Sequence, residues 1–180
     1  VDRVVNGVEV DCQIASDNAA GAKMATEYLV ELIGEGAKAA ELEGVPGASA
    51  TIDRGAGFHG AADAALYVVA SQTANFNRAE GMNVMENILQ SCPEVKGVFA
   101  HNDEMALGAV EAVLASGKDI KIVGFDATDD AVAAVKSGKM AATVAQKPEL
   151  MGETAVQTAM KLINGETVEK SLPVEVELIK

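Results

Sequence analysis

The chain has 180 residues, of which 49% are hydrophobic and 23% charged, and its formal net charge is −13. This size and composition are typical of a globular protein with one domain, or with one domain and part of another. The strong negative charge argues against nucleic-acid binding, because phosphate backbones would be repelled, and no basic run points to a membrane surface. No apolar run approaches the roughly 20 residues of a membrane-spanning helix.

Strand-like and helix-like patterns alternate along the whole chain. Alternating or continuous apolar runs predict strands over residues 8–15, 38–42, 67–70, 98–100, 120–125, 141–145 and 174–179. Helical spacing predicts helices over residues 19–33, from Ser49 onward, 78–89, 103–114, 131–136 and 148–163. Strands that take turns with helices are typical of βαβ units. The predicted fold class is therefore α/β, with a doubly wound, mostly parallel sheet covered on both faces.

Polar residues stand where the predicted helices begin. Either Ser16 or Asp17 would cap the helix that follows the first strand. Asp103 stands where a cap would stand after the buried run Val98-Phe99-Ala100. The first residues, Val1-Asp2-Arg3, contain no Met and resemble the end of a strand whose beginning is missing. We therefore expect the chain to be a fragment of a longer protein.

A second group of polar side chains, with one aromatic ring, lies just past the predicted strands. Because open α/β sheets bind ligands at the carboxyl ends of their strands, these residues are expected to converge on one edge. The group consists of Asp2, Arg3, Arg54, Phe76, Asn102, Asp126 and Gln146.

This group suits a polyol. Carboxylates and carboxamides form paired hydrogen bonds in one plane, and arginine donates through a rigid fork. Adjacent sugar hydroxyls present a matching pair, and an aromatic ring offers an apolar face to the C–H surface of a sugar. Simpler roles remain open: Asp126 would also fit a helix cap, Asn102 a turn, Arg54 a surface charge and Phe76 ordinary core.

Catalytic and metal motifs are not found in the sequence. No GxGxxG opens a helix after a strand, and there is no Walker lysine loop or GxSxG elbow. His101 adjoins the predicted site without an evident Ser or Cys partner, so we expect it and His59 to be structural. Neither a metal nor a cofactor is expected. Cys12 and Cys92 are expected to be free thiols, although a disulfide is not ruled out by their spacing.

Several segments resemble the ribose-binding proteins of bacterial ABC transporters, within the periplasmic binding protein family. The similar segments are VDR (1–3), IASDN (14–18), ELEGVPGASA (41–50), DRGAGF (53–58), VASQTANFNR (69–78), VFAHNDEMALGA (98–109), IVGFDAT (122–128) and AATVAQKP (141–148). NDEMALGA and VGFD also occur in sugar-sensing repressors, whereas their combination with DR, RGAGF, NFNR and AQ points to ribose. The resemblance covers the whole chain and corresponds to the latter part of the family's sequence.

The resemblance implies that the seven residues named above contact a monosaccharide, with D-ribose first. It implies two hinged lobes: residues 1–17 would end the N-terminal lobe, 18–146 would form the C-terminal lobe, 147–175 would return to the first lobe and 176–180 to the second. It also implies a membrane permease as partner, with a chemoreceptor as a second candidate partner, and a periplasmic or lipid-anchored location. The alternative is the sugar-sensing effector domain of a lactose-repressor-type regulator; an enzyme on this fold is disfavoured.

Overall fold

The fold is described by a computed structural model that covers residues 1–4 and 7–180. Its main sheet has six strands in the order β3-β2-β4-β5-β6-β8, and a separate small sheet pairs β1 with β7. Strands β3, β2, β4, β5 and β6 run parallel, while β8 pairs antiparallel with β6. The predicted fold class, α/β with a mostly parallel sheet, is therefore confirmed.

Most element ends lie within one or two residues of the predicted ones. The strands are β1 (Gln13–Ser16), β2 (Lys38–Glu43), β3 (Tyr67–Thr73), β4 (Gly97–Ala100), β5 (Lys121–Asp126), β6 (Ala142–Ala145), β7 (Ser171–Val174) and β8 (Glu177–Ile179). The helices are α1 (Asn18–Ile33), α2 (Ser49–Ala65), α3 (Arg78–Ser91), α4 (Asp103–Ser116), α5 (Asp129–Lys136) and α6 (Pro148–Ile163). Within the described residues, no helix is both long enough and apolar enough to cross a bilayer.

Three strand predictions were wrong in extent. The first strand begins at Gln13, not at residue 8, because its partner β7 begins opposite it at Ser171 and offers nothing for residues 8–12 to pair with. The predicted strand over 174–179 is two strands in different sheets, β7 and β8. Strand β3 continues beyond residue 70 to Thr73, because β2 extends far enough to pair with it.

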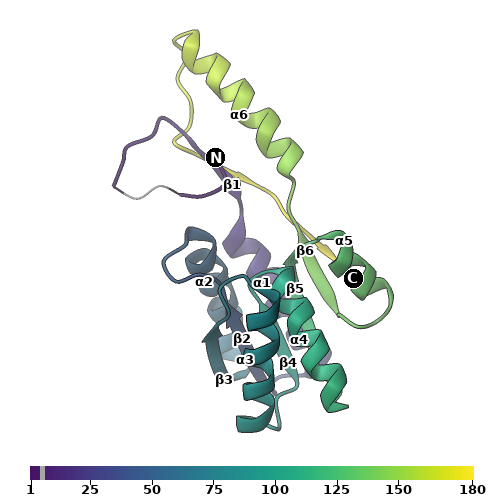
Figure 1. The fold of residues 1–180 in the computed structure, drawn as a ribbon. Helices are drawn as coiled ribbons and strands as arrows, with labels where there is room; N and C mark the ends of the chain where they lie inside the picture. The colour runs from purple at the N-terminus through teal and green to yellow at the C-terminus, as the bar shows by residue number, and fades with distance from the viewer. Residues whose placement is uncertain (5–6) are drawn as a thin grey trace.

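Helices cover both faces of the main sheet (Figure 1). On one face α1 and α2 pack over a core that includes Phe58 and Phe99, and on the other α3 and α4 pack over a core that includes Val98 and Met105. Successive side chains of a strand point to opposite faces, so β4 supplies Val98 to one core and Phe99 to the other. Both are fully buried, which explains why this strand reads as a continuous apolar run.

Helices α1 and α2 approach until their backbones almost touch. A Cβ atom added to Gly57 on α2 would lie 2.2 Å from the carbonyl oxygen of Ala19 on α1, so glycine is required at this crossing. The approach brings Asn18, at the start of α1, beside Arg54 on α2. Helix packing on one face of the sheet therefore sets the position of a predicted site residue.

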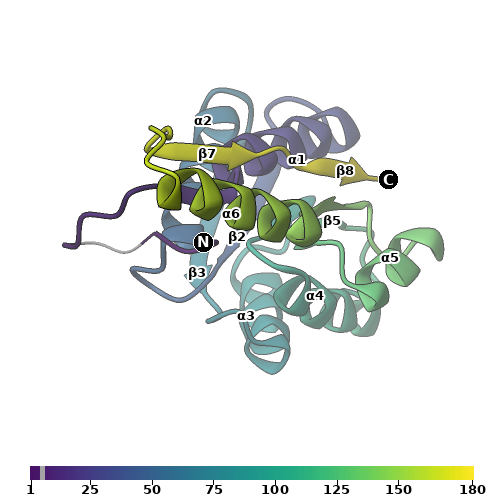
Figure 2. The same cartoon turned by 90° about the horizontal axis from the view of Figure 1, so that it is seen from above.

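The small sheet and α6 form a second unit that stands away from the main sheet (Figure 1). Seen from above, α6 and β7 lie across the upper end of the molecule (Figure 2). A small core of Ile14, Met151 and Val174 joins β1, α6 and β7. The chain passes between the two units three times, from β1 to α1, from β6 to α6 and from β7 to β8.

Candidate sugar-binding site

One cavity collects all the side chains predicted at the strand ends. It has a volume of about 230 Å³ and is lined by Asp2, Arg3, Ala50, Arg54, Phe76, Asn102, Asp126 and Gln146. It lies at the carboxyl end of the parallel strands, near the point where the connections from β2 and from β4 leave in opposite directions, the usual ligand position in open α/β sheets. The structure thus brings together the seven predicted residues and adds Ala50.

Arg54 is buried, with only 5% of its surface exposed, and several groups hold its side chain in place. Its Nε donates to Oδ1 of Asn18 at 2.8 Å, and its Nη1 donates to the backbone carbonyl of His101. Nη1 also lies 3.4 Å from Oδ1 of Asp126, and the guanidinium carbon lies 3.7 Å from the ring centroid of Phe125. Burial lowers the pKa of Arg54, and the nearby Asp126 charge opposes this shift. The guanidinium is a fixed, desolvated donor fork.

Asp126 and Gln146 form a bridge between the two units. Nε2 of Gln146 donates to Oδ1 of Asp126 at 2.7 Å, and its Oε1 accepts from the hydroxyl of Ser16 at 2.7 Å. Asp126 ends β5 of the main sheet, whereas Ser16 ends β1 of the small sheet. Burial raises the pKa of Asp126, although the Arg54 charge and the Gln146 hydrogen bond act against the rise.

Asn102, and not Asp103, caps α4. Its Oδ1 accepts from the N–H of Met105 at 3.0 Å, so the predicted cap was wrong by one residue. No hydrogen bond from its Nδ2 is found within the described part of the chain, which leaves that amide group as a donor in the cavity wall. At α1 the two predicted candidates are resolved in favour of Asp17, whose Oδ1 accepts from the N–H of Ala20.

Backbone strain is concentrated at the cavity. Among the described residues, five non-glycine residues have positive φ: Asp2 (70°), Asn75 (52°), Phe76 (58°), Asp126 (123°) and Ala127 (53°). Three of them line the cavity, and the other two are their direct neighbours in the chain. Such conformations cost about 1–3 kcal/mol each and tend to persist where function requires them.

The lining of the cavity combines buried and exposed residues. Arg54 and Asn102 are buried, whereas Asp2 and Arg3 are exposed. The N–H of Asp2 donates to the carbonyl of Ile14 at 2.7 Å, which ties the start of the chain to β1. A second cavity of about 430 Å³ adjoins the first, sharing Asp2, Asp126 and Gln146 and continuing to Pro148, Met151 and Gly152 of α6.

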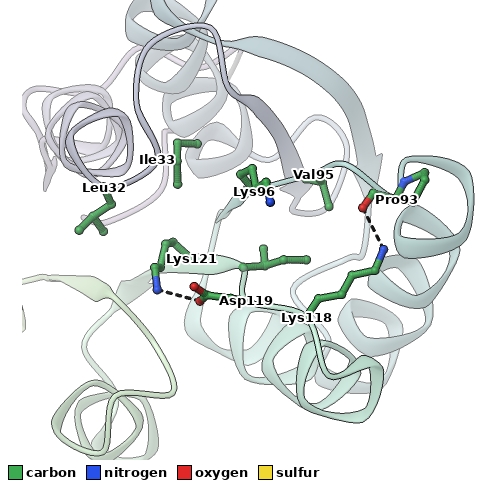
Figure 3. A pocket seen from close by; sticks show the side chains of 9 residues that line it. Leu32, Ile33, Pro93, Val95, Lys96, Lys118, Asp119 and Lys121 are labelled. Atoms are coloured by element: carbon green, nitrogen blue, oxygen red, sulfur yellow. Dashed lines mark hydrogen bonds and ion pairs between the residues drawn. The ribbon is translucent and has the colours of Figure 1, made fainter.

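Another cavity lies at the opposite end of the strands, where they begin (Figure 3). It has a volume of about 420 Å³ and combines apolar side chains with three lysines. Two of these lysines are already occupied, because Lys118 donates to the carbonyl of Pro93 at 2.9 Å and Lys121 donates to Asp119 at 2.8 Å. It also lies at the amino ends of the strands, away from the usual ligand edge, so the strand-end cavity is the better candidate.

Sequence reasoning missed the residues that support Arg54. Asn18 and Phe125 are not among the residues predicted for the site, yet both contact the guanidinium. Ser16, a rejected cap candidate, instead holds Gln146. Their positions directly beside a strand end were the available signal, but the partner of each lies on a distant segment.

Asp103 makes the stability of this region depend on pH. The carboxylate is fully buried and accepts from the hydroxyl of Thr143 at 2.6 Å and from the N–H of Thr128 at 2.8 Å. Burial raises its pKa from 3.8 to about 6, against those hydrogen bonds. The folded state therefore binds more protons between these values, and the stability due to Asp103 is complete below pH 3.8 and lost as the pH rises through 6.

We expect the destabilisation caused by Asp103→Asn to shrink by roughly 2 kcal/mol between pH 4 and pH 7. The wild type loses the protonated group's contribution over this range, whereas the variant has none to lose. Urea unfolding of both proteins at four pH values measures the difference. Asp119→Asn is the control. Because Lys121 lowers the pKa of Asp119, the destabilisation caused by Asp119→Asn can only increase with pH. A constant difference for Asp103→Asn would contradict the prediction.

Comparison with known proteins places the chain in a family. The model of the periplasmic binding protein domain matches residues 1–167. The chain belongs to the periplasmic binding protein family. Two relatives of this periplasmic binding protein are both called ribose import binding protein. The one from Bacillus subtilis is 51% identical over 178 residues (99% of this chain, 58% of the relative), and the one from Haemophilus influenzae is 52% identical over 180 residues (99% and 62%).

Solved structures agree with the family assignment. An ABC transporter solute-binding protein from Bacillus halodurans, with bound myo-inositol, superposes with a TM-score of 0.90 at 36% identity over 99% of this chain and 64% of that one. The present periplasmic binding protein chain thus spans about 60% of the length of the curated relatives it matches.

Proposed function

We propose that this chain is part of the substrate-binding component of a sugar ABC transporter, and that its ligand is D-ribose. The observation that carries the proposal is the meeting of seven polar and aromatic side chains, drawn from seven positions along the chain, in one cavity at the ligand edge of the sheet. Residues placed by chance would not be expected to gather in one cavity, three of them with strained, positive φ angles.

The chemistry of the lining suits a small polyol. Arg54 supplies fixed donors, Asp126 supplies carboxylate acceptors and Asn102 supplies an amide donor. Hydrogen bonds to charged groups are the stronger kind, and a buried site built from them rejects ligands that leave them unpaired. The ring of Phe76 offers an apolar face for the C–H surface of the sugar.

The choice of ribose rests on the relatives. Those that are about half identical to this chain are called ribose import binding proteins, whereas the solute-binding protein that holds myo-inositol is only 36% identical. Both ligands carry adjacent hydroxyls, so the geometry of the cavity alone favours a polyol in general, and the relatives favour the pentose in particular.

The two units are proposed to be parts of two lobes. In this division residues 1–17 and 147–175 belong to one lobe, and residues 18–146 and 176–180 to the other. The separate sheets, the three connections between them and the Gln146 bridge from Ser16 to Asp126 support it. Closure of one lobe on the other would bury the exposed Asp2 and Arg3 against the ligand, by hinge motion of the periplasmic binding protein type.

The protein is proposed to bind and release its sugar unchanged, without catalysis. Its partner would be the membrane permease of the transporter, with a chemoreceptor as a second possible partner. It would act in the cell envelope, either in the periplasm or anchored to lipid outside the cell.

Isothermal titration of the full-length protein with ribose, arabinose, glucose and galactose tests the proposal. We expect saturable heat with ribose and much weaker heat with the other sugars, because unpaired buried groups are costly. Absence of heat with any pentose would overturn the ribose assignment, and absence of heat with every sugar would overturn the sugar-binding function.

A further inference from the structure

A buried carboxylate lies between two histidines directly behind the cavity. Glu41 on β2 is fully buried, as is His101 at the end of β4. Oε1 of Glu41 lies 2.8 Å from Nε2 of His101, and Oε2 lies 3.2 Å from Nε2 of His59 on α2. The other ring nitrogen of His59 lies 2.8 Å from Asp63, on the surface. None of these side chains lines the cavity, so the sugar chemistry proposed above does not use them.

The hydrogen bonds of His101 define the role of each of its ring nitrogens. Its Nδ1 accepts from the backbone N–H of Gly44 at 3.3 Å and therefore carries no proton. Its Nε2 must then carry the proton and donate it to Glu41. Burial alone would raise the pKa of Glu41, but hydrogen bonds from His101 and Ser71 together with the neighbouring His101 and His59 lower it, which favours the carboxylate form of the acceptor. The imidazole is thus anchored on a buried carboxylate.

His101 touches the supports of two cavity residues. Its backbone carbonyl accepts from Nη1 of Arg54. Its ring holds the N–H of Gly44, and the ring of Phe76 packs so closely on Gly44 that an added Cβ would lie 2.0 Å from Cζ of Phe76. A shift of His101 would therefore move both the guanidinium donor and the apolar face.

We propose that Glu41 and His101 are positioning residues for the sugar site: the Glu41 carboxylate orients the His101 ring, and His101 in turn fixes Gly44 under Phe76 and the carbonyl that holds Arg54. The inference rests on the proposed function, because it concerns the affinity of that same cavity. Its distinctive claim is that a group with no sugar contact sets the affinity through the hydrogen bond to Gly44.

Replacing His101 by glutamine and by leucine separates the effect of its hydrogen bonds from the effect of filling its space. The carboxamide of glutamine offers a donor and an acceptor on one carbon, as the imidazole offers two nitrogens flanking one carbon, so His101→Gln is expected to keep near-wild-type affinity for ribose. His101→Leu removes both groups, and we expect about tenfold weaker binding, the effect of one lost hydrogen bond on an equilibrium.

A double variant keeps the test valid if His101→Leu folds poorly. His101→Leu alone leaves Glu41 as a buried anion without its main partner, whereas Glu41→Leu with His101→Leu replaces both by apolar groups of similar size, which restores much of the stability. The N–H of Gly44 still lacks its acceptor in the double variant. We therefore expect the double variant to melt higher than His101→Leu yet to bind ribose as weakly.

Thr26→Val is the matched control. Thr26 is a fully buried polar residue on α1 whose hydroxyl bonds to the carbonyl of Ala22, outside the cavity, so its loss should lower stability and leave affinity unchanged. All affinities are measured by titration with ribose on full-length protein, below the melting transition of each variant. Wild-type affinity in the folded double variant would overturn the inference while the proposed function stands. No binding by the wild type would overturn both.

Discussion

Replacement of Arg54 by methionine is expected to abolish measurable ribose binding, with a loss of at least about a hundredfold in affinity. Two charge-assisted hydrogen bonds to a ligand are together worth about 3–6 kcal/mol. The same change leaves the carboxylate of Asp126 near a vacated space and deprives Asn18 and the His101 carbonyl of their donor. Removal of one partner from a fully buried pair costs about 3–5 kcal/mol; because the side chain of Asp126 is partly exposed, the free energy of unfolding should fall by less than this.

Arg78→Met is the control for Arg54→Met. Arg78 also forms ion pairs, with Glu104 and Asp130, but at the protein surface, where such pairs contribute about 0–1 kcal/mol. It does not line the strand-end cavity. Calorimetric titration and urea unfolding of both variants give the comparison. Wild-type affinity in Arg54→Met would remove Arg54 from the site, whatever its effect on stability.

Gly57→Ala is expected to lower the stability of the chain strongly, although it adds only one methyl group. The new Cβ would lie 2.2 Å from the Ala19 carbonyl oxygen, which is backbone and can move only with α1. Overpacking of this kind costs about 1–3 kcal/mol or more. Since displacement of α1 also moves Asn18 away from Arg54, the affinity for ribose should fall with the stability.

Gly60→Ala, three residues further along α2, should have the opposite effect. A Cβ at Gly60 meets nothing within 4 Å, and alanine is favoured over glycine inside a helix by about 0.5–1 kcal/mol. Thermal unfolding of the two variants and the wild type measures both shifts. Equal stability of Gly57→Ala and Gly60→Ala would show that the helices can separate without cost.

The residues of the site could be predicted to a large extent because sequence position and spatial position coincide at strand ends. Asn102, Asp126 and Gln146 each come shortly after a buried apolar run, and parallel strands bring such residues to one edge. Arg54 and Phe76 were found in the same way, after the strands that precede them. Their role as sugar ligands stays a prediction until binding is measured.

The remaining features depend on contacts that no local pattern encodes. Asn102 and Asp103 are both good capping residues, and only the burial of Asp103 against Thr143 decides between them. The strand over residues 174–179 reads as one run, but the two sheets divide it. The extent of β1 depends on where its partner starts, more than 150 residues later in the chain.

The long separation between β1 and β7 has a consequence for how the molecule is assembled. The small sheet joins Gln13 to Ser171, so it cannot form until residues far along the chain from β1 have been made. Strands β2 to β6 instead pair with segments close to them in sequence, for which loop closure costs less entropy. During synthesis the parallel sheet is therefore able to form first, and β1 cannot pair with β7 until residues 171–174 have been made.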